Sequence, residues 1–378
     1  MLVTISVSGI FHAFHLAEQL QRRGYLKKII TNYPKIVLGK WKSGVSNDKI
    51  EAIPIQTIHH LLGKLGINIY SLNFFLRDMF DRLASKNIKN CDILVGFSGV
   101  GLHSIKKAKR NGIITIVERG SSHSLYSKKI LYEEYKKFGI KKAYSEKFIK
   151  RELKEYREAD YISIPSKFVE RTFLENGVPK EKLIRVPYGV DIEEFKQTPK
   201  KDNIFRIVYL GQLSLRKGVH YLLQAYSELK LKNTELLIGG RITDENIKPF
   251  LKKYEGNYKF AGYIPQENIS EFYSQGSVFV LPSIEEGLAM VQLQAMACGL
   301  PVICTTNTGG EDIIRNGKEG FIVPIRDVEA LKEKILYLSS NPEKCKRMGY
   351  NAKKMVRENF TWDYYGDRII KKYKEILN

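Results

Sequence analysis

The sequence predicts an α/β protein built from two doubly wound domains with parallel sheets. Short apolar runs that suit buried strands alternate with longer amphipathic segments that suit helices, and this alternation occurs twice along the chain. The first series begins at residues 2–7 and the second at residues 206–210. A length of 378 residues is enough for two such domains. We therefore expect a ligand in a central cleft between the domains, outside the carboxyl ends of the strands.

The first series contains five expected strands. Residues 14–22 are amphipathic at helical spacing and form the expected helix after the first strand. Residues 58–84 are also apolar at helical spacing, which we interpret as core packing, with a membrane-facing helix as the alternative. The stretch 186–191 is typical of a domain exit, so we assign residues 1–187 to the first domain. The expected strands are residues 2–7, 28–31, 92–95, 113–117 and 161–164.

The second series contains six expected strands and is assigned to residues 188–360. Its most informative helix is expected at residues 289–298, where Gly299 ends it, and another short helix is expected at residues 311–315. The expected strands are residues 206–210, 235–238, 259–260, 278–281, 302–304 and 321–323.

The net charge of the chain is +21 at pH 7, and this charge is unevenly distributed. Residues 1–187 hold 34 Lys and Arg against 17 Asp and Glu, whereas residues 188–378 hold 28 against 24. A basic surface attracts nucleic acid, anionic lipid or a phosphorylated substrate. A general bias toward lysine would raise the positive charge of both halves of the chain. Because only residues 1–187 carry most of the excess, we favour a surface function for it. The basic residues carry no motif that reads bases, so nucleic acid is not an expected partner.

The segment 128–157 interleaves cations with aromatic residues. An exposed pair of helices, separated at Gly139 and packing its aromatic side chains inward, explains this pattern. A surface for an anionic membrane or a lipid-phosphate acceptor explains it equally well, and both interpretations stay open. The cations considered are Lys136, Lys137, Lys141, Lys142, Lys147, Lys150, Arg151, Lys154 and Arg157.

Cysteine usage and hydropathy indicate the cytoplasm. The four Cys residues show no metal or redox spacing and fit buried thiols in a reducing compartment. No run of 18 apolar residues predicts a membrane-spanning helix, and the first residues lack the basic region of a signal peptide. We expect a cytoplasmic protein, with peripheral attachment at the inner face of the membrane as a further expectation from the basic half.

Two acidic residues, Glu285 and Glu286, stand between an expected strand and the helix 289–298. The N-terminus of a helix carries free amide donors and a partial positive charge, which favour phosphate. Carboxylates beside such a place are better suited to accept hydrogen bonds from sugar or ribose hydroxyls. We therefore expect Glu286 to contact a ligand and Glu285 to face solvent, the alternative being that both are solvated loop charges.

Residues 277–325 resemble the nucleotide-binding domain of retaining glycosyltransferases of family 4, which have the GT-B fold of two Rossmann-like domains facing a central cleft. In that family two Glu residues stand eight positions apart, the first before a Gly and the second ahead of Ala-Met-Ala. Glu286 matches the first, and the resemblance implies that it holds the donor sugar. Gln294 replaces the second, which usually holds the ribose. A hydrogen bond to a charged group contributes about 1.5–3 kcal/mol and a neutral one about 0.5–1.5 kcal/mol, so we expect a weaker grip on the nucleotide.

The resemblance also indicates which groups bind the donor diphosphate. Lys217 matches the Lys that clamps it, whereas Gln212 stands where an Arg is usual, and we expect Arg216 to supply that charge. Fixed cations are needed because negative charge builds on the leaving diphosphate as the glycosidic bond breaks. Backbone amides expected at the donor are those of Gly9, Gly287, Leu288, Ala289, Gly309 and Gly310.

Three other parts of the chain match the family more loosely. His123 follows a strand after which the family often places a His near the reacting sugar. Tyr263 and Ile264 lie in the expected base-binding loop, whose contacts are largely backbone, and a UDP-sugar is favoured over a GDP-sugar. Residues 361–378 resemble a C-terminal helix that crosses back to the first domain. The resemblance implies no cofactor and no metal, and the sequence has no Asp-x-Asp motif.

The expected activity is transfer of a hexosyl or N-acetylhexosaminyl group, with retention, from a nucleotide diphosphate sugar to a glycan or lipid-linked acceptor. The family implies a place in cell-surface polysaccharide biosynthesis and front-side attack, with the leaving phosphate as base. One alternative is a transferase with a soluble acceptor. Another is a non-catalytic protein that binds nucleotide sugars or glycans, which is suggested by the Gln residues at positions 212 and 294.

Overall fold

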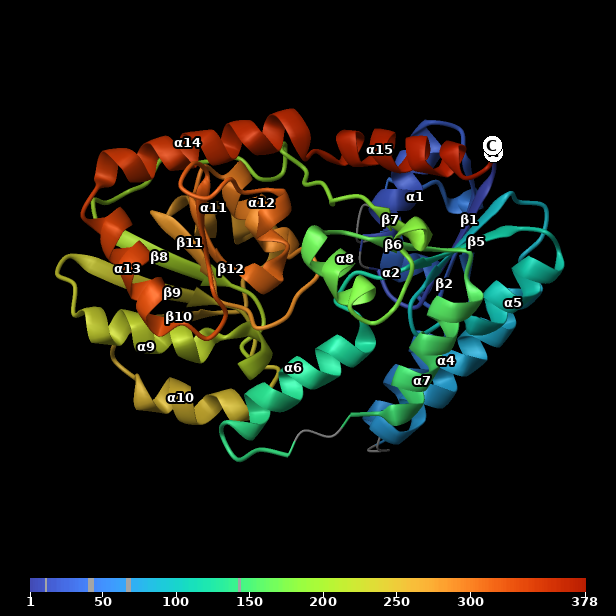
Figure 1. Ribbon diagram of the computed structural model, residues 1–378, viewed down its shortest axis with the longest axis horizontal. Coiled ribbons are helices and arrows are strands. Elements are labelled where there is room, and N and C mark those ends of the chain that lie inside the picture. Colours follow the sequence, from blue (N-terminus) through green and yellow to red (C-terminus); the bar gives the residue numbers. More distant parts are fainter. Residues whose placement is uncertain (11, 40–43, 66–68, 142–143) are drawn as a thin grey trace.

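The computed structural model describes residues 1–378 except residues 11, 40–43, 66–68 and 142–143. Two parallel sheets lie in separate halves of the molecule, each between layers of helices (Figure 1). Strands of such sheets are covered on both faces, so their sequences are continuous apolar runs. β11 (Val278–Leu281) is such a run, and β1 (Val3–Val7) is also buried along its whole length although it contains Thr4 and Ser6. The predicted α/β class with two doubly wound domains is confirmed.

The first sheet has, among the described residues, seven strands in the order β3-β2-β1-β4-β5-β6-β7, and every pair is parallel. The expected strands are all present, and β3 and β7 are additional short edge strands. After β1, the strands of this sheet are β2 (Leu26–Thr31), β3 (Ile50–Ala52), β4 (Ile93–Phe97), β5 (Ile114–Glu118), β6 (Tyr161–Ile164) and β7 (Leu183–Arg185).

The second sheet has, in the described part of the chain, six parallel strands in the order β10-β9-β8-β11-β12-β13. The order reverses between β8 and β11, as it does between β1 and β4 in the first sheet, and such reversal points are where doubly wound sheets bind ligands. Besides β11, the strands are β8 (Phe205–Leu210), β9 (Thr234–Gly239), β10 (Lys259–Gly262), β12 (Val302–Thr305) and β13 (Gly320–Val323).

Helices of the first domain follow its strands. The predicted helical segment 58–84 corresponds to two helices, α3 and α4, and residues 66–68 between them lie outside the described residues. The helices are α1 (Ala13–Arg22), α2 (Lys35–Gly39), α3 (Ile55–Lys64), α4 (Ile69–Lys86), α5 (Leu102–Arg110), α6 (Ser124–Lys136), α7 (Glu146–Glu158) and α8 (Lys167–Leu174).

Helices of the second domain include the one on which the acidic motif depends, α12 (Met290–Ala297). The last two, α14 and α15, run end to end along one side of the molecule, from the second domain to the first (Figure 1). The remaining helices are α9 (Val219–Leu229), α10 (Lys248–Lys253), α11 (Ile269–Ser274), α13 (Val328–Ser339), α14 (Pro342–Asn359) and α15 (Trp362–Glu375).

The chain crosses between the domains at two places that touch each other. Val190, in the first crossing, forms a parallel bridge with Thr361 in the second. A Cβ on Gly189 would lie 2.5 Å from the backbone of Thr361, so only glycine permits this close approach. Beyond the crossing, α15 packs on α1, where Arg23 Nη2 lies 2.7 Å from Asp367 Oδ1.

The expected helix at residues 311–315 is wrong, because the structure has only the 3₁₀ turn Gly310–Asp312 there. Tertiary bonds compete with helical ones at this point. The Asp312 carboxylate accepts from the Lys167 amide at 2.8 Å and from Arg185 Nη1 at 2.6 Å. The amide of Arg315 donates to Glu319 Oε2 at 2.8 Å, which turns the chain toward β13.

The basic segment 128–157 forms α6 and α7, and its aromatic residues do not share one environment. Tyr135 is buried, whereas Tyr132 is 51% exposed and Phe138 is 36% exposed. Arg151 is also buried, in ion pairs with Asp81 and its neighbours, so it adds nothing to a basic surface. Lys142, which the sequence places among these cations, lies outside the described residues. Within the described part of the chain, no helix combines the length and the apolar character that crossing a membrane requires.

Candidate active site

The loops that follow β8 and β11 bring the predicted cations and acids together. Ser214 caps the 3₁₀ turn Leu215–Lys217, and the amide of Ile284 donates to the Arg216 carbonyl oxygen at 2.9 Å. Gly218 has a φ of +65°, and a Cβ there would lie 2.0 Å from the carbonyl oxygen of Pro282. Glycine is therefore required for the two loops to pack this closely.

Glu286 lies against both predicted phosphate-binding cations. It is 7% exposed, and its carboxylate contacts Arg216 Nη2 at 3.2 Å and pairs with the Lys217 ammonium. Burial alone would raise the pKa of Glu286, but Arg216 and Lys217 outweigh it and hold the pKa below its ordinary value. Burial lowers the pKa of Lys217, and Glu286 partly offsets this effect. Without ligand, the cations and acids of this site therefore neutralise one another.

Glu285 is not solvent-facing as expected, because it is only 1% exposed and reaches the other domain. Its Oε1 accepts from the amide of Ser122 at 3.0 Å and from Ser122 Oγ at 2.7 Å. Its Oε2 accepts from Arg216 Nη1 at 3.0 Å. Glu285 thus links the first domain to a predicted diphosphate-binding residue of the second. The adjacent pair of acids in this loop is visible in the sequence. The contact of Glu285 with the first domain is not visible there, because Ser122 is distant along the chain.

The two domains touch backbone to backbone beside these acids. Gly287 forms an antiparallel bridge with Ser121, and a Cβ on Gly287 would lie 1.8 Å from the carbonyl oxygen of Gly120. Ser166 Oγ, also from the first domain, donates to the Gly287 carbonyl oxygen at 2.8 Å. Gly309 lies on the other side, where an added Cβ would be 2.6 Å from that same oxygen. The loop before the N-terminus of α12 therefore lies where the two domains are in contact.

His123, which is expected near the reacting sugar, is buried at the start of α6. Its ring packs between Tyr156 and Phe173, and its Nδ1 accepts from the amide of Leu125 at 3.3 Å. Burial and, to a lesser extent, Arg119 lower the pKa of His123 to about 4. The ring is therefore neutral at physiological pH and caps a helix that begins at the domain contact.

The other predicted donor-binding residues differ in their burial. Leu288, Ala289 and Gly310 are buried, Gln294 is half-buried on α12, and Gln212 is exposed after β8. The side chain of Gln294 has one long contact, with Tyr273 Oη at 3.5 Å. Gly9 follows β1 with a φ of +143°.

The expected base-binding loop lies at the carboxyl end of β10. Tyr263 is 58% exposed and Ile264 is half-buried. The guanidinium of Arg241, which follows β9, lies 3.9 Å from the centre of the Tyr263 ring. This stacked pair was not expected from the sequence, because Arg241 and Tyr263 are distant along the chain.

A helix of the first domain makes a second, buried contact with the second domain. Glu134 on α6 is fully buried and accepts from Tyr221 Oη at 2.8 Å and from Arg326 Nε at 2.6 Å, and it lies 3.0 Å from His220 Nε2. Two residues after the end of α6, Phe138 packs edge-on against His220. The C-terminal end of α6 therefore belongs to the core contacts of the second domain.

Comparisons with known proteins agree with this geometry. Residues 190–355 match the family described as glycosyl transferases group 1. A capsular polysaccharide biosynthesis glycosyltransferase, CapM of Staphylococcus aureus, is 30% identical over 242 residues, which cover 58% of this chain and 62% of CapM. A GDP-mannose-dependent mannosyltransferase of Mycolicibacterium smegmatis is 26% identical, with 56% and 61% covered. The match thus spans about three fifths of the length of these relatives.

Solved structures match over nearly the entire chain. The sucrose-phosphate synthase of Thermosynechococcus elongatus has a TM-score of 0.73 at 19% identity and covers 100% of this chain and 99% of its own. Anabaena HepE in complex with UDP and glucose has a TM-score of 0.72 at 16% identity, with 99% and 100% covered. The protein therefore has the GT-B fold, and its residues 190–355 match the family of glycosyl transferases group 1. The resemblance to GT-B glycosyltransferases is thereby confirmed.

Proposed function

We propose that this protein is a retaining glycosyltransferase of family 4 that uses a nucleotide diphosphate sugar, with a UDP-sugar favoured. The acceptor is a glycan or a lipid-linked glycan, and the product belongs to a cell-surface polysaccharide. The observation that carries the proposal is the cluster of Glu285, Glu286, Arg216 and Lys217 at the carboxyl ends of β8 and β11, against the other domain. The relatives named for capsule synthesis and the HepE complex with UDP support the donor and the pathway.

The donor diphosphate replaces the carboxylates as partner of the two cations. Arg216 and Lys217 then neutralise the charge that grows on the leaving phosphate, where fixed cations stabilise the transition state most. Glu286, released from Lys217, accepts hydrogen bonds from the donor sugar. Because the site is largely buried, each of these interactions is stronger than it would be in water.

The transfer follows front-side attack. The acceptor oxygen forms a bond to the anomeric carbon on the face from which the bond to the phosphate oxygen breaks. The proton of the acceptor hydroxyl goes to that phosphate oxygen, and nucleoside diphosphate leaves. The neutral His123 and the buried Glu285 hold the loop and the cation in place in this scheme and take no proton.

Product analysis tests the proposal. Purified protein is incubated with UDP-, GDP- and ADP-sugars, donor hydrolysis is followed, and the anomer first released is identified by NMR. We expect turnover with one donor and retention of its anomeric configuration. Inversion would overturn the retaining assignment. Binding of a nucleotide sugar in a thermal-shift screen without any turnover, with acceptor glycans present, would favour the non-catalytic alternative instead.

A further inference from the structure

A large cavity lies in the second domain at the edge opposite to the candidate active site. Its volume is 1170 Å³, and its floor is formed where β8, β9, β11 and β12 begin rather than where they end. Helix α14 forms one wall. Drug-sized pockets are about 300–1,000 Å³, so this cavity is large enough for a small organic molecule.

The residues that line the cavity account for the whole excess of positive charge in residues 188–378. Six of the 28 Lys and Arg in residues 188–378 line it, against two of the 24 Asp and Glu, so the rest of this half is balanced at 22 of each. Concave surfaces lined by one sign of charge focus the electric field and concentrate counter-ions. The lining cations are Lys200, Lys232, Lys346, Lys353, Lys354 and Arg357.

Several of these cations are available to a ligand. Within the described residues, no carboxylate lies within ion-pair distance of Lys232, Lys353 or Arg357. Lys353 and Arg357 lie one turn apart on α14, so they present their charges on the same side of that helix.

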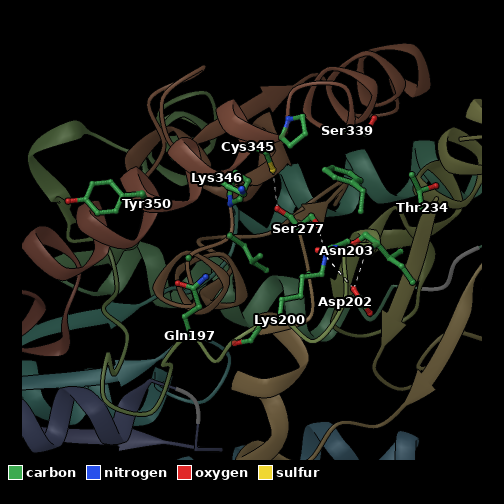
Figure 2. Close-up of a pocket in the computed structure, with 18 of the residues that line it drawn as sticks. Gln197, Lys200, Asp202, Asn203, Thr234, Ser277, Ser339, Cys345, Lys346 and Tyr350 are labelled. Carbon is green, nitrogen blue, oxygen red and sulfur yellow. Dashed lines mark hydrogen bonds and ion pairs between the residues drawn. The ribbon is translucent and has the colours of Figure 1, made fainter. Parts of the chain in front are cut away.

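The floor of the cavity is fixed by internal bonds. The Lys200 ammonium donates to Ser277 Oγ at 2.9 Å, and the Cys345 thiol on α14 donates to the carbonyl oxygen of Ser277 at 3.2 Å (Figure 2). Apolar side chains complete the walls, among them Phe205 and Leu300. The cavity thus combines a preformed, partly apolar interior with unpaired cations.

We propose that this cavity binds a phosphate-bearing organic anion of the size of a sugar phosphate or a nucleotide. The phosphate lies against Lys353 and Arg357 on α14, Lys232 adds positive potential from the opposite wall, and the organic part lies on the apolar wall. This site is separate from the donor site and does not depend on the proposed reaction.

Isothermal titration calorimetry with inorganic pyrophosphate tests the site in a Lys217→Ala background, which removes the principal cation of the donor site. We expect one equivalent of pyrophosphate to bind. Adding Lys353→Glu and Arg357→Glu should weaken this binding at least tenfold. Glucose 1-phosphate and UMP then distinguish a sugar phosphate from a nucleotide as the preferred class.

The matched control reverses two other charges of the same helix. Lys344→Glu and Arg347→Glu change the net charge equally but lie outside the cavity lining, so binding should stay within twofold. Lys232→Glu, in the loop before β9, provides a second variant on the opposite wall if the α14 variant melts early. Absence of binding in the Lys217→Ala protein, or an equal loss in the control, would overturn the proposal.

Discussion

At the scale of single residues, the candidate site without ligand is a set of paired charges. Arg216 bridges both acids, and Lys217 pairs with Glu286. An unpaired buried charge is strongly destabilising, so the acids keep the cations in place until a diphosphate replaces them. This arrangement gives each acid a separate testable function.

Glu286→Gln should lower turnover at least tenfold, because a neutral amide neither pairs with Lys217 nor accepts as strongly from sugar hydroxyls. Steady-state kinetics with the donor identified by the screen measures this change. Glu255→Gln, an exposed residue of the second domain, is the control and should behave as the parent protein. Turnover within twofold of that of the parent protein would show that Glu286 does not contact the donor sugar.

Glu285→Gln should lower turnover through Arg216, because the amide loses the ion pair at 3.0 Å. If Glu285 acts together with Ser122, the effects of Glu285→Gln and Ser122→Ala on kcat/KM should not add in the double variant. We expect a coupling free energy of at least about 0.5 kcal/mol. Melting temperatures of all four proteins separate this coupling from a loss of stability. Simple additivity would show that the link between the domains is not used in the reaction.

At the scale of elements, the strands and the motif helix could be predicted from the sequence, whereas the contacts between elements could not. Apolar runs bounded by glycine and proline predict buried strands, and the motif predicts α12. Glu285 was misplaced because its partner, Ser122, is 163 residues away. The helix at residues 311–315 failed for the same reason, since the partners of Asp312 are on α8 and β7.

Helix α6 joins the two domains through buried contacts, and its contribution to stability is measurable. Glu134→Ala should destabilise the protein by about 1–3 kcal/mol, because it leaves the buried Tyr221 hydroxyl and His220 ring without their acceptor. Urea unfolding followed by circular dichroism gives this change. Glu133→Ala, on the same helix but half exposed and 3.5 Å from Arg326, should change stability by less than about 1 kcal/mol. Equal effects of both variants would mean that burial of Glu134 is unimportant.

At the scale of the whole molecule, buried histidines predict that acid weakens the fold. Burial is the main cause that lowers the pKa of His15 and of His123 to about 4, from an ordinary value of 6.5. A group with a lowered pKa contributes stability above its unfolded pKa and loses it as the pH falls. The free energy of unfolding should therefore decrease by about 1–3 kcal/mol per histidine between pH 6.5 and 4.

Urea titrations at half-unit steps of pH measure this dependence. His123→Asn retains a side chain that caps α6 but does not titrate, so its profile should be flatter than that of the parent protein. An unchanged slope would contradict the contribution of His123.

The basic first domain predicts salt-sensitive binding to anionic membranes. Each Lys near such a surface contributes about 1 kcal/mol, so Lys136→Glu, Lys137→Glu and Lys141→Glu together should greatly reduce flotation with phosphatidylserine liposomes. Donor hydrolysis should persist in the Lys136→Glu, Lys137→Glu double variant, whereas Lys141 lines the same pocket as Arg216 and is left out of that measurement.

The matched control reverses Lys371, Lys372 and Lys374 on α15, which runs along the opposite side of the molecule (Figure 1). Its flotation should resemble that of the parent protein. No flotation of the parent protein at low salt would favour a soluble acceptor.

The two chain crossings at Gly189 and Thr361 restrict how the domains can move. Because both connections pass through one spot, the domains have a common pivot, and their relative motion is reduced to rotation about it. Opening the cleft then breaks the contacts of Gly287 and Glu285 while the backbone pairing of Val190 with Thr361 stays in place. The lever arms on either side are rigid, since α14 and α15 each consist of several turns. We therefore expect that a change of backbone angle at the pivot would separate Glu285 from Ser122 while the two chain crossings stay paired.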